Sequence, residues 1–353
     1  MKPRNHLMTW YERHRRDLPW RRTRDPYAIW ISEIMLQQTR VETALPYYQE
    51  FLNRFPTVED LARAEIEEVL GAWSGLGYYR RARMLHGAAR QISARGGRLP
   101  DNLDELRQMP GVGSYTAAAI GSIAFGIAEP AIDGNVERVI SRYLGIDSDP
   151  KKGEGRRRVL AGAREMIDER RPGDSNQALM ELGATLCRPR RPQCEDCPLC
   201  AGCQARITGD PESLPVSGPR PRTIRVRRRV AVVQNGQRVL LFRRPESSGQ
   251  LAGMWELPWV ESVDGVPRQA QFEDRYPGEW KLGDSVGVVR HAITQRLFEI
   301  EVLSARLATA EVVADGPEAG WFDTAEIAAL PVSSMVRKVL QVAARSGALA
   351  GGE

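Results

Sequence analysis

The stretch LDELRQMPGVGSYTAAAIGSIAF, residues 103–125, decides the fold of the first part of this chain. Apolar residues recur at helical spacing on both sides of a Met-Pro-Gly-Val-Gly turn, so the sequence predicts two helices joined by a tight hairpin. Glycine at positions 111 and 113 lets the backbone approach a ligand closely, and the amides that open the second helix form an anion site. Gly111, Val112 and Gly113 are therefore candidate phosphate contacts, although a turn that simply requires glycine explains the same residues.

The helical pattern extends outward from this hairpin, from Trp10 to about Glu181. It ends before a proline-rich stretch, after which the sequence favours strands at 229–234, 238–242 and 297–303 and helices at 325–330 and 336–344. We expect an all-α domain over 1–208, a Pro/Arg-rich linker over 209–225, an α+β domain over 226–346 and a tail over 347–353.

Length and composition narrow the class of protein. The 353 residues exceed what one core supports, and 42% hydrophobic with 27% charged residues exclude a disordered chain. The longest apolar stretch, 117–128, is too short to cross a membrane, and no apolar signal core follows the N-terminus, which predicts an intracellular protein. Residues 1–208 carry a net charge of +5 and residues 230–353 a net charge of −4, so the first part suits a polyanion such as nucleic acid.

All five cysteines lie within residues 187–203. An odd, clustered set in an intracellular chain indicates a metal site rather than disulfides. The spacing singles out four ligands, with Cys200 as a spare: Cys187, Cys194, Cys197 and Cys203. Four thiolates on one loop suit either tetrahedral zinc or an iron–sulfur cluster, and the chemistry of sulfur does not choose between them.

Two acidic residues are candidates for catalysis. Glu33 lies in the apolar helical run WISEIML, residues 30–36, where burial would raise its pKa and keep it protonated as a general acid; exposure would make it an ordinary surface residue. Asp133 precedes a helix, whose free amides favour the ionised carboxylate, and this is also the usual position of a plain helix cap. One neutral and one charged carboxyl is the arrangement that cleaves glycosidic bonds.

Six motifs in order give this chain a family resemblance. They are LPW (18–20), SEIMLQQT (32–39), GLGYY (75–79), the glycine hairpin, DGNV (133–136) and the four-cysteine loop. The combination resembles the MutY family of adenine DNA glycosylases, within the helix-hairpin-helix superfamily that includes endonuclease III. The resemblance implies an all-α helix-hairpin-helix glycosylase domain with a [4Fe-4S] cluster on the four cysteines. It also implies a base excision repair enzyme that hydrolyses the N-glycosidic bond of adenine opposite 8-oxoguanine or guanine in duplex DNA.

The resemblance also implies roles for individual residues. Glu33 would protonate N7 of an extruded adenine and then activate water, and Asp133 would support the sugar intermediate with help from Tyr115 and Asn135. Endonuclease III-like enzymes that cut the strand have a lysine where this chain has Tyr115, so we expect base removal without strand cleavage. The adenine pocket would contain Arg16, Leu18, Trp20, Arg21 and Gln177. The wedge that enters the duplex would be Gln38 and Tyr78, with Thr39 and Leu76 as further DNA contacts.

The second domain resembles the Nudix-like module with which MutY proteins recognise 8-oxoguanine. The segment LAGMWELP, residues 251–258, matches its central motif, and the glutamate-rich metal box of true Nudix pyrophosphatases is not found. Where the family often has Phe-Ser-His, this chain has Ile293-Thr294-Gln295, so Thr294 retains only the hydroxyl. The resemblance implies a monomer associated with DNA, not with a membrane, in the bacterial cytoplasm.

Two other functions are compatible with parts of the sequence. A glycosylase for thymine or another mismatched base would use a similar tyrosine and aspartate, but the second domain argues against it. A non-catalytic protein that binds damaged DNA would use the hairpin and the cysteine loop only for docking. The presence of both Glu33 and Asp133 disfavours this second alternative, because a binding protein needs neither an acid nor a charge stabiliser.

Overall fold

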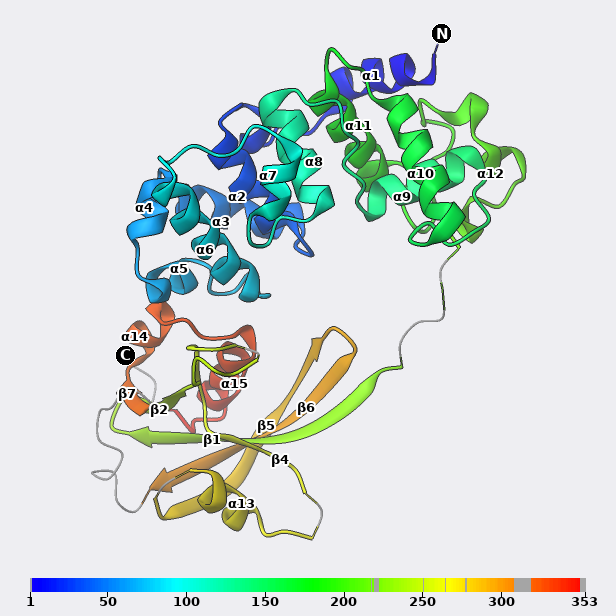
Figure 1. Ribbon diagram of the computed structural model, residues 1–353. Helices are drawn as coiled ribbons and strands as arrows, with labels where there is room; N and C mark the ends of the chain where they lie inside the picture. The colour runs from blue at the N-terminus through cyan, green and yellow to red at the C-terminus, as the bar shows by residue number, and fades with distance from the viewer. Residues whose placement is uncertain are drawn as a thin grey trace. The chain divides into compact units, whose positions relative to one another are not determined.

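The computed structural model describes residues 2–216, 218, 222–249, 251–263, 265–276, 278–307 and 319–349 (Figure 1). The chain forms two compact units: Met1–Arg63 with Met84–Pro219, and Ala64–Arg83 with Arg220–Glu353. The second unit thus contains a short piece of the helical region as well as all the strands. Parts of the expected linker (217 and 219–221) and of the expected tail (350–353) lie outside the described residues.

The first unit is helical. Its helices are α1 (Pro3–His14), α2 (Pro26–Leu36), α3 (Val41–Arg54), α4 (Val58–Arg63), most of α6 (Arg80–Ala94), α7 (Leu103–Gln108), α8 (Ser114–Phe125), α9 (Gly134–Leu144), α10 (Gly153–Met166), α11 (Pro172–Thr185) and α12 (Gln204–Ile207). Three short 3-10 turns accompany them: η1 (Pro19–Arg21), η2 (Cys200–Gly202) and η3 (Pro211–Ser213). None of the described helices has the length and apolar character needed to cross a membrane.

Two groups of helices form the interior of this unit. Helix α2 is buried over almost its whole length and packs against α8, because both helices are apolar on all sides. The apolar faces of α1, α9, α10 and α11 form a second core, which includes Leu7, Val139, Val159 and Leu179. The predicted helix–hairpin–helix is confirmed, with α7 ending at Gln108 and α8 beginning at Ser114. These cores hold the first turns of α8 and α9 and the middle of α2 in fixed positions.

The second unit combines α5 (Ile66–Ala72) and the start of α6 with a mixed seven-stranded sheet. The strands are β1 (Ile224–Asn235), β2 (Arg238–Arg243), β3 (Trp255–Glu256), β4 (Trp259–Glu261), β5 (Trp280–Ile293), β6 (Arg296–Leu307) and β7 (Ala319–Phe322). Their order is β3-β2-β1-β6-β5, with β4 paired to β1 and β7 paired to β2. Only β1 and β6 pair in parallel; the other named pairs are antiparallel.

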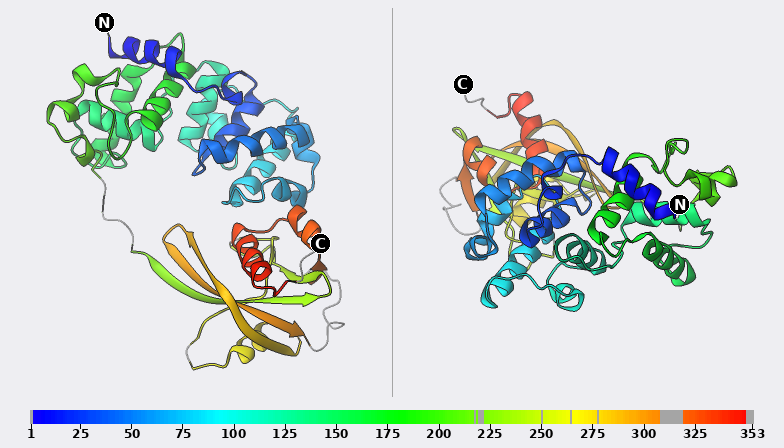
Figure 2. Two further views of the ribbon diagram at one scale, coloured as in Figure 1. Left: turned by 180° about the vertical axis from the view of Figure 1, so that it is seen from behind. Right: turned by 90° about the horizontal axis from the view of Figure 1, so that it is seen from above.

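Helices cover both faces of this sheet, because successive residues of a strand point to opposite faces. In β1, Val230 and Val232 face the core under α14 (Thr324–Ala329) and α15 (Ser334–Arg345). The intervening Ala231 and Val233 face the core that includes Phe272 of α13 (Arg268–Arg275). Figure 1 and Figure 2 show α13 and α15 on opposite sides of the strands.

The longest strand, β5, was not predicted from the sequence. It contains Gly283 and Gly287 and lacks regular alternation of apolar residues, so it shows little strand character. In the structure it pairs with β6 through two shifts of register, between Leu282 and Ser285 and between Ser285 and Gly287. The pairing with β6, rather than the local sequence, therefore makes this segment a strand.

Candidate active site

Glu33 lies in the interior of the first unit, near the end of α2. The helix begins after Asp25, whose carboxylate accepts hydrogen bonds from the amides of Tyr27 and Ala28. Only 5% of Glu33 is exposed. Burial raises the pKa of Glu33 to about 7, and the nearby charge of Asp133 acts in the same direction. A carboxyl with this pKa is substantially protonated at neutral pH, as a general acid requires.

Tyr115 connects Glu33 to the hairpin. It lies in the first turn of α8, and its hydroxyl donates a 2.8 Å hydrogen bond to Oε2 of Glu33. This bond favours the ionised carboxylate and so lowers the pKa of Glu33, but the effect of burial is larger. The pKa of Tyr115 itself is raised well above its usual value by burial and by the charges of Glu33 and Asp133. The tyrosine therefore stays protonated and acts as a hydrogen-bond donor.

Asp133 caps the N-terminus of α9. Its Oδ1 accepts a 2.8 Å hydrogen bond from the amide of Val136, and its Oδ2 accepts one of 2.8 Å from Nδ2 of Asn135. These bonds lower the pKa of Asp133, as expected from the sequence, but burial outweighs them and the pKa is raised overall. The helix start therefore favours the ionised form, as expected, and burial of the carboxyl is a second effect that opposes it. The charge of Asp133 acts on both Glu33 and Tyr115, so the two carboxyls lie near each other inside the first unit.

Arg138, one turn further along α9, links this site to the cysteine loop. Its Nη2 donates 2.8 Å hydrogen bonds to Oδ1 of Asn135 and to the carbonyl of Gly183. Its Nε donates a 2.8 Å bond to the carbonyl of Cys187. Arg138 was not predicted from the sequence, because its position four residues after Gly134 on a helix carries no distinctive signal. It holds Asn135 in the orientation that contacts Asp133.

Arg16 and Arg21, two of the expected pocket residues, converge on Glu181 of α11. Arg16 contacts both carboxylate oxygens at 2.8 Å, and Nη2 of Arg21 donates a 2.8 Å bond to Oε2. Burial acts to raise the pKa of Glu181, but the two arginines outweigh it and lower the pKa to about 2. Sequence analysis missed Glu181, although a lone acid in the apolar helical run 178–182 is the same signal that identified Glu33.

The other expected pocket residues lie on the same elements. Leu18 and Trp20 are buried around η1, and the ring of Trp20 meets Tyr48 edge-on. Gln177 lies one turn before Glu181 on α11, and its side chain donates to the carbonyl of Gly173. On the same helix, Sδ of Met180 lies 3.6 Å from the hydroxyl of Tyr115. Helix α11 therefore runs beside the Glu33–Tyr115 pair and carries the pocket candidate Gln177.

Several of the expected DNA contacts have an unusual backbone. Gln38, after the end of α2, has φ +57°, and Tyr78, between α5 and α6, has φ +50°. Non-glycine residues rarely adopt this left-handed region, and such strain concentrates at functional sites. Thr39 follows Gln38 in the first unit, whereas Leu76 is buried and belongs with Tyr78 to the second unit.

Two glycines form the turn of the hairpin. Gly111 has φ +80°, and a side chain there would meet Cβ of Met84 at 3.1 Å. Gly113 precedes α8 without any side-chain cap, and the space beside its Cα is open. Val112 is buried between the two glycines and fixes the turn. The first amides of α8 therefore remain available to a ligand.

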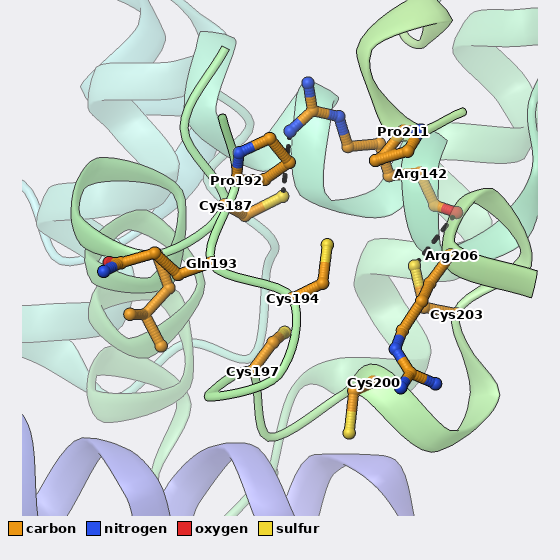
Figure 3. A pocket seen from close by; sticks show the side chains of 11 residues that line it. Arg142, Cys187, Pro192, Gln193, Cys194, Cys197, Cys200, Cys203, Arg206 and Pro211 are labelled. Carbon is orange, nitrogen blue, oxygen red and sulfur yellow. Dashed lines mark hydrogen bonds between the residues drawn. The ribbon is translucent and has the colours of Figure 1, made fainter. Parts of the chain in front are cut away.

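The five cysteines line one pocket with Arg142 and Arg206. Figure 3 shows the sulfurs of Cys187, Cys194, Cys197 and Cys203 around a common space, whereas the sulfur of Cys200 points away from it. Arg142 approaches Sγ of Cys187 at 3.5 Å. Among the described residues, no three His, Cys, Asp or Glu side chains are grouped closely enough to hold a single metal ion. A cluster of four irons is larger than one ion, and four soft thiols with adjacent cations fit such a group.

Thr294 lies in the two-residue turn between β5 and β6. It is exposed, has φ +52°, and its hydroxyl donates a 2.7 Å bond to the carbonyl of Ile293. A β-branched residue in this conformation is unusual, because glycine or asparagine normally occupies it. Thr294 belongs to the second unit, whereas Glu33 and Asp133 belong to the first.

Comparison with known proteins agrees with both units. Residues 31–164 match the HhH-GPD superfamily of base excision DNA repair proteins, and residues 229–342 match the NUDIX domain. The chain is 36% identical to human adenine DNA glycosylase over 96% of this chain and 73% of that protein. It is 39% identical to the Arabidopsis thaliana adenine DNA glycosylase over 74% of this chain and 48% of that protein.

Among solved structures, a thermostable thymine-DNA glycosylase is similar to the first part of the chain. It has a TM-score of 0.53 and 32% identity over 58% of this chain and 95% of its own. The human adenine DNA glycosylase, in contrast, matches 96% of this chain, which includes the second unit. This protein therefore belongs to the family of adenine DNA glycosylases.

Proposed function

We propose that the protein removes adenine paired with 8-oxoguanine, or with guanine, from duplex DNA. The observation that carries this proposal is the position of Tyr115, which bonds to one buried carboxyl and experiences the charge of the other. Two carboxyls with different partners in one buried site are the requirement for cleaving a glycosidic bond. Membership of the adenine DNA glycosylase family supports adenine as the base.

In this proposal Glu33 acts first as the acid. Its proton passes to N7 of adenine, the bond between C1′ and N9 breaks, and the bonding electron pair leaves with the base. The sugar becomes an oxocarbenium ion, which the carboxylate of Asp133 stabilises, held by the Val136 amide and by Asn135. Glu33, now ionised, accepts a proton from the attacking water and is ready for another cycle.

Strand cleavage is not part of the proposal. An enzyme that cuts the strand uses an amine, which forms an imine with the sugar. The hydroxyl of Tyr115 is occupied as a donor to Glu33 and cannot form an imine. We therefore expect an abasic site in an intact strand as the product.

The lesion-reading part of the proposal rests on the second unit. Thr294, in its strained turn conformation, presents the hydroxyl that would contact the oxidised guanine. Replacing Thr294 with valine keeps the shape and removes the hydroxyl. We expect this variant to lower the ratio of the excision rates opposite 8-oxoguanine and guanine, while the rate opposite guanine stays unchanged.

The four cysteines would hold a [4Fe-4S] cluster, with Cys200 outside the ligand set. Burial raises the pKa of Cys197 to about 12, so an unligated thiol there would stay protonated. When bound, the cluster would fix the shape of the 187–203 loop. Measurement of iron and acid-labile sulfide tests this part; one zinc per chain without iron would contradict it.

One assay tests the main proposal. Purified protein is mixed with duplexes that contain A opposite 8-oxoguanine, A opposite G, or T opposite G. Each reaction mixture is then split into two portions, of which one stays neutral and the other is treated with alkali to break the strand at abasic sites. Loss of adenine from the first duplex, with breakage only after alkali, is the expected result. Release of thymine alone would favour the alternative that the 32% identity to a thymine-DNA glycosylase suggests. Binding without release of any base would indicate a damage-binding protein.

A further inference from the structure

The segment that carries Tyr78 is bound to the C-terminal part of the second unit, which is Arg220–Glu353. It runs from Ser74 to Tyr79 between α5 and α6, and its backbone has three positive φ angles: +111° at Gly75, +74° at Gly77 and +50° at Tyr78. The side chain of Tyr78 is 44% exposed, whereas Ser74 and Tyr79 are buried. Such a backbone persists only where the surroundings hold it.

One carbonyl group accepts two hydrogen bonds from this segment. The carbonyl of Val332, which precedes α15, accepts a 2.9 Å bond from the hydroxyl of Tyr79 and a 3.1 Å bond from that of Ser74. The Tyr79 hydroxyl in turn accepts a 3.1 Å bond from the amide of Gly75. Nη2 of Arg337, on α15, donates a 2.8 Å bond to the Ser74 hydroxyl. The two bonds to the Val332 carbonyl are buried, so water does not easily replace them.

The other side of the segment is held by α6. The guanidinium of Arg81 stacks on the rings of Trp73 and Tyr78, at 5.3 and 5.6 Å from their centres. The carbonyl of Gly77 accepts bonds from both Arg81 and Trp73. An ion pair of 3.0 Å between Arg83 and Glu246 adds a further link to the C-terminal part. The strained backbone at Tyr78 is therefore held from two sides, and one of them is the C-terminal part.

We propose that Ser74, Tyr79 and Arg337 are positioning residues through which the C-terminal part of the chain holds Tyr78 in the conformation that enters DNA. The inference rests on the proposed function, because Tyr78 can enter DNA beside an extruded base only if the protein extrudes one. It gives the C-terminal part a second role beside reading the lesion. That part would help to keep the base stack open, whether or not 8-oxoguanine is present.

Two variants break the connection from its two ends. Tyr79→Phe removes the hydroxyl that bridges the Val332 carbonyl and the Gly75 amide, and Arg337→Met removes the donor to Ser74. Tyr276→Phe is the matched control. Tyr276 lies in the same unit, and its hydroxyl donates to the carbonyl of Trp259. This residue is distant from the 74–79 segment in the sequence, and its hydrogen bond is made to a residue outside that segment.

The first measurement is hydrogen exchange of the 74–81 amides in the full-length protein. We expect exchange about 5- to 30-fold faster in either variant, as the loss of one or two hydrogen bonds implies. The control should match the wild type. This measurement does not depend on catalysis, so it remains valid if the protein excises no adenine and the proposed function fails.

The second measurement compares single-turnover excision from a fully paired duplex and from one with adenine in a short mismatched bubble. We expect each variant to slow excision from the paired duplex at least fivefold and to leave excision from the bubble within twofold of wild type, since the bubble is already unstacked. The double variant should be no slower than the worse single variant. Equal losses on both substrates, or wild-type exchange in the 74–81 segment, would overturn the proposal.

Discussion

Replacing Tyr115 with phenylalanine should move the alkaline limb of the pH–rate profile to higher pH. The Tyr115 hydroxyl donates to Oε2 of Glu33 at 2.8 Å and thereby favours the ionised carboxylate. Removal of this donor disfavours the ionised form, so the pKa of Glu33 must rise from its value of about 7. A hydrogen bond to a charged group contributes about 1.5–3 kcal/mol, and one pKa unit corresponds to about 1.4 kcal/mol. The expected shift is therefore about one to two pH units.

The assay is single-turnover adenine excision from about pH 5 to pH 10 under saturating enzyme, which removes DNA binding from the rate. The acid must be protonated to act, so the wild-type rate should fall as the pH rises through about 7. The limb of the Tyr115→Phe variant should lie at higher pH, whatever its maximal rate. Tyr27→Phe is the control, because that hydroxyl lies on the same helix as Glu33 but donates to the carbonyl of Phe55. If the rate of Tyr115→Phe falls at the same pH as that of the wild type, or at a lower pH, this account of Glu33 is refuted.

Three further predictions concern the surroundings of the two carboxyls. Asp133→Asn should lower excision at least about 1,000-fold while duplex affinity changes little, because the charge that stabilises the oxocarbenium ion is lost; a variant with near wild-type rates would exclude Asp133 from the chemistry. Glu181→Gln should lower the free energy of unfolding at pH 7 by about 3 kcal/mol, because the folded pKa of about 2 lies below the ordinary value of 4.5. That difference should shrink in denaturant titrations as the pH falls from about 4.5 towards 2, and a difference independent of pH would contradict it. Arg138→Met removes the two bonds that join α9 to α11 and to the cysteine loop, together with the bond to Asn135, and should slow excision at least tenfold with a lower melting temperature; normal excision in a destabilised protein would limit Arg138 to a structural role.

Local patterns in the sequence were sufficient to identify the elements that carry the site. The glycine hairpin at 111–113, the polar residue in an apolar helix at Glu33 and the acidic cap at Asp133 each depend on neighbours within a few residues. Such signals can be read from the sequence because helix periodicity and capping depend on residues only a few positions apart. Strand β5 was not predicted, because it is a strand through its pairing with β6 and not through a pattern in its own residues.

Contacts between distant segments were decided by tertiary packing. The pairing of Tyr115 with Glu33 joins residues 82 positions apart, and the pairing of Arg16 with Glu181 joins residues 165 apart. The pKa of Asp133 shows the difference most clearly: its hydrogen bonds follow from the local sequence, but the direction of the shift follows from burial, to which the whole unit contributes. The attachment of the Tyr78 segment to the Val332 carbonyl likewise appears in no local pattern. A sequence specifies which groups are present and their near neighbours, whereas desolvation and long-range partners exist only once the chain has packed.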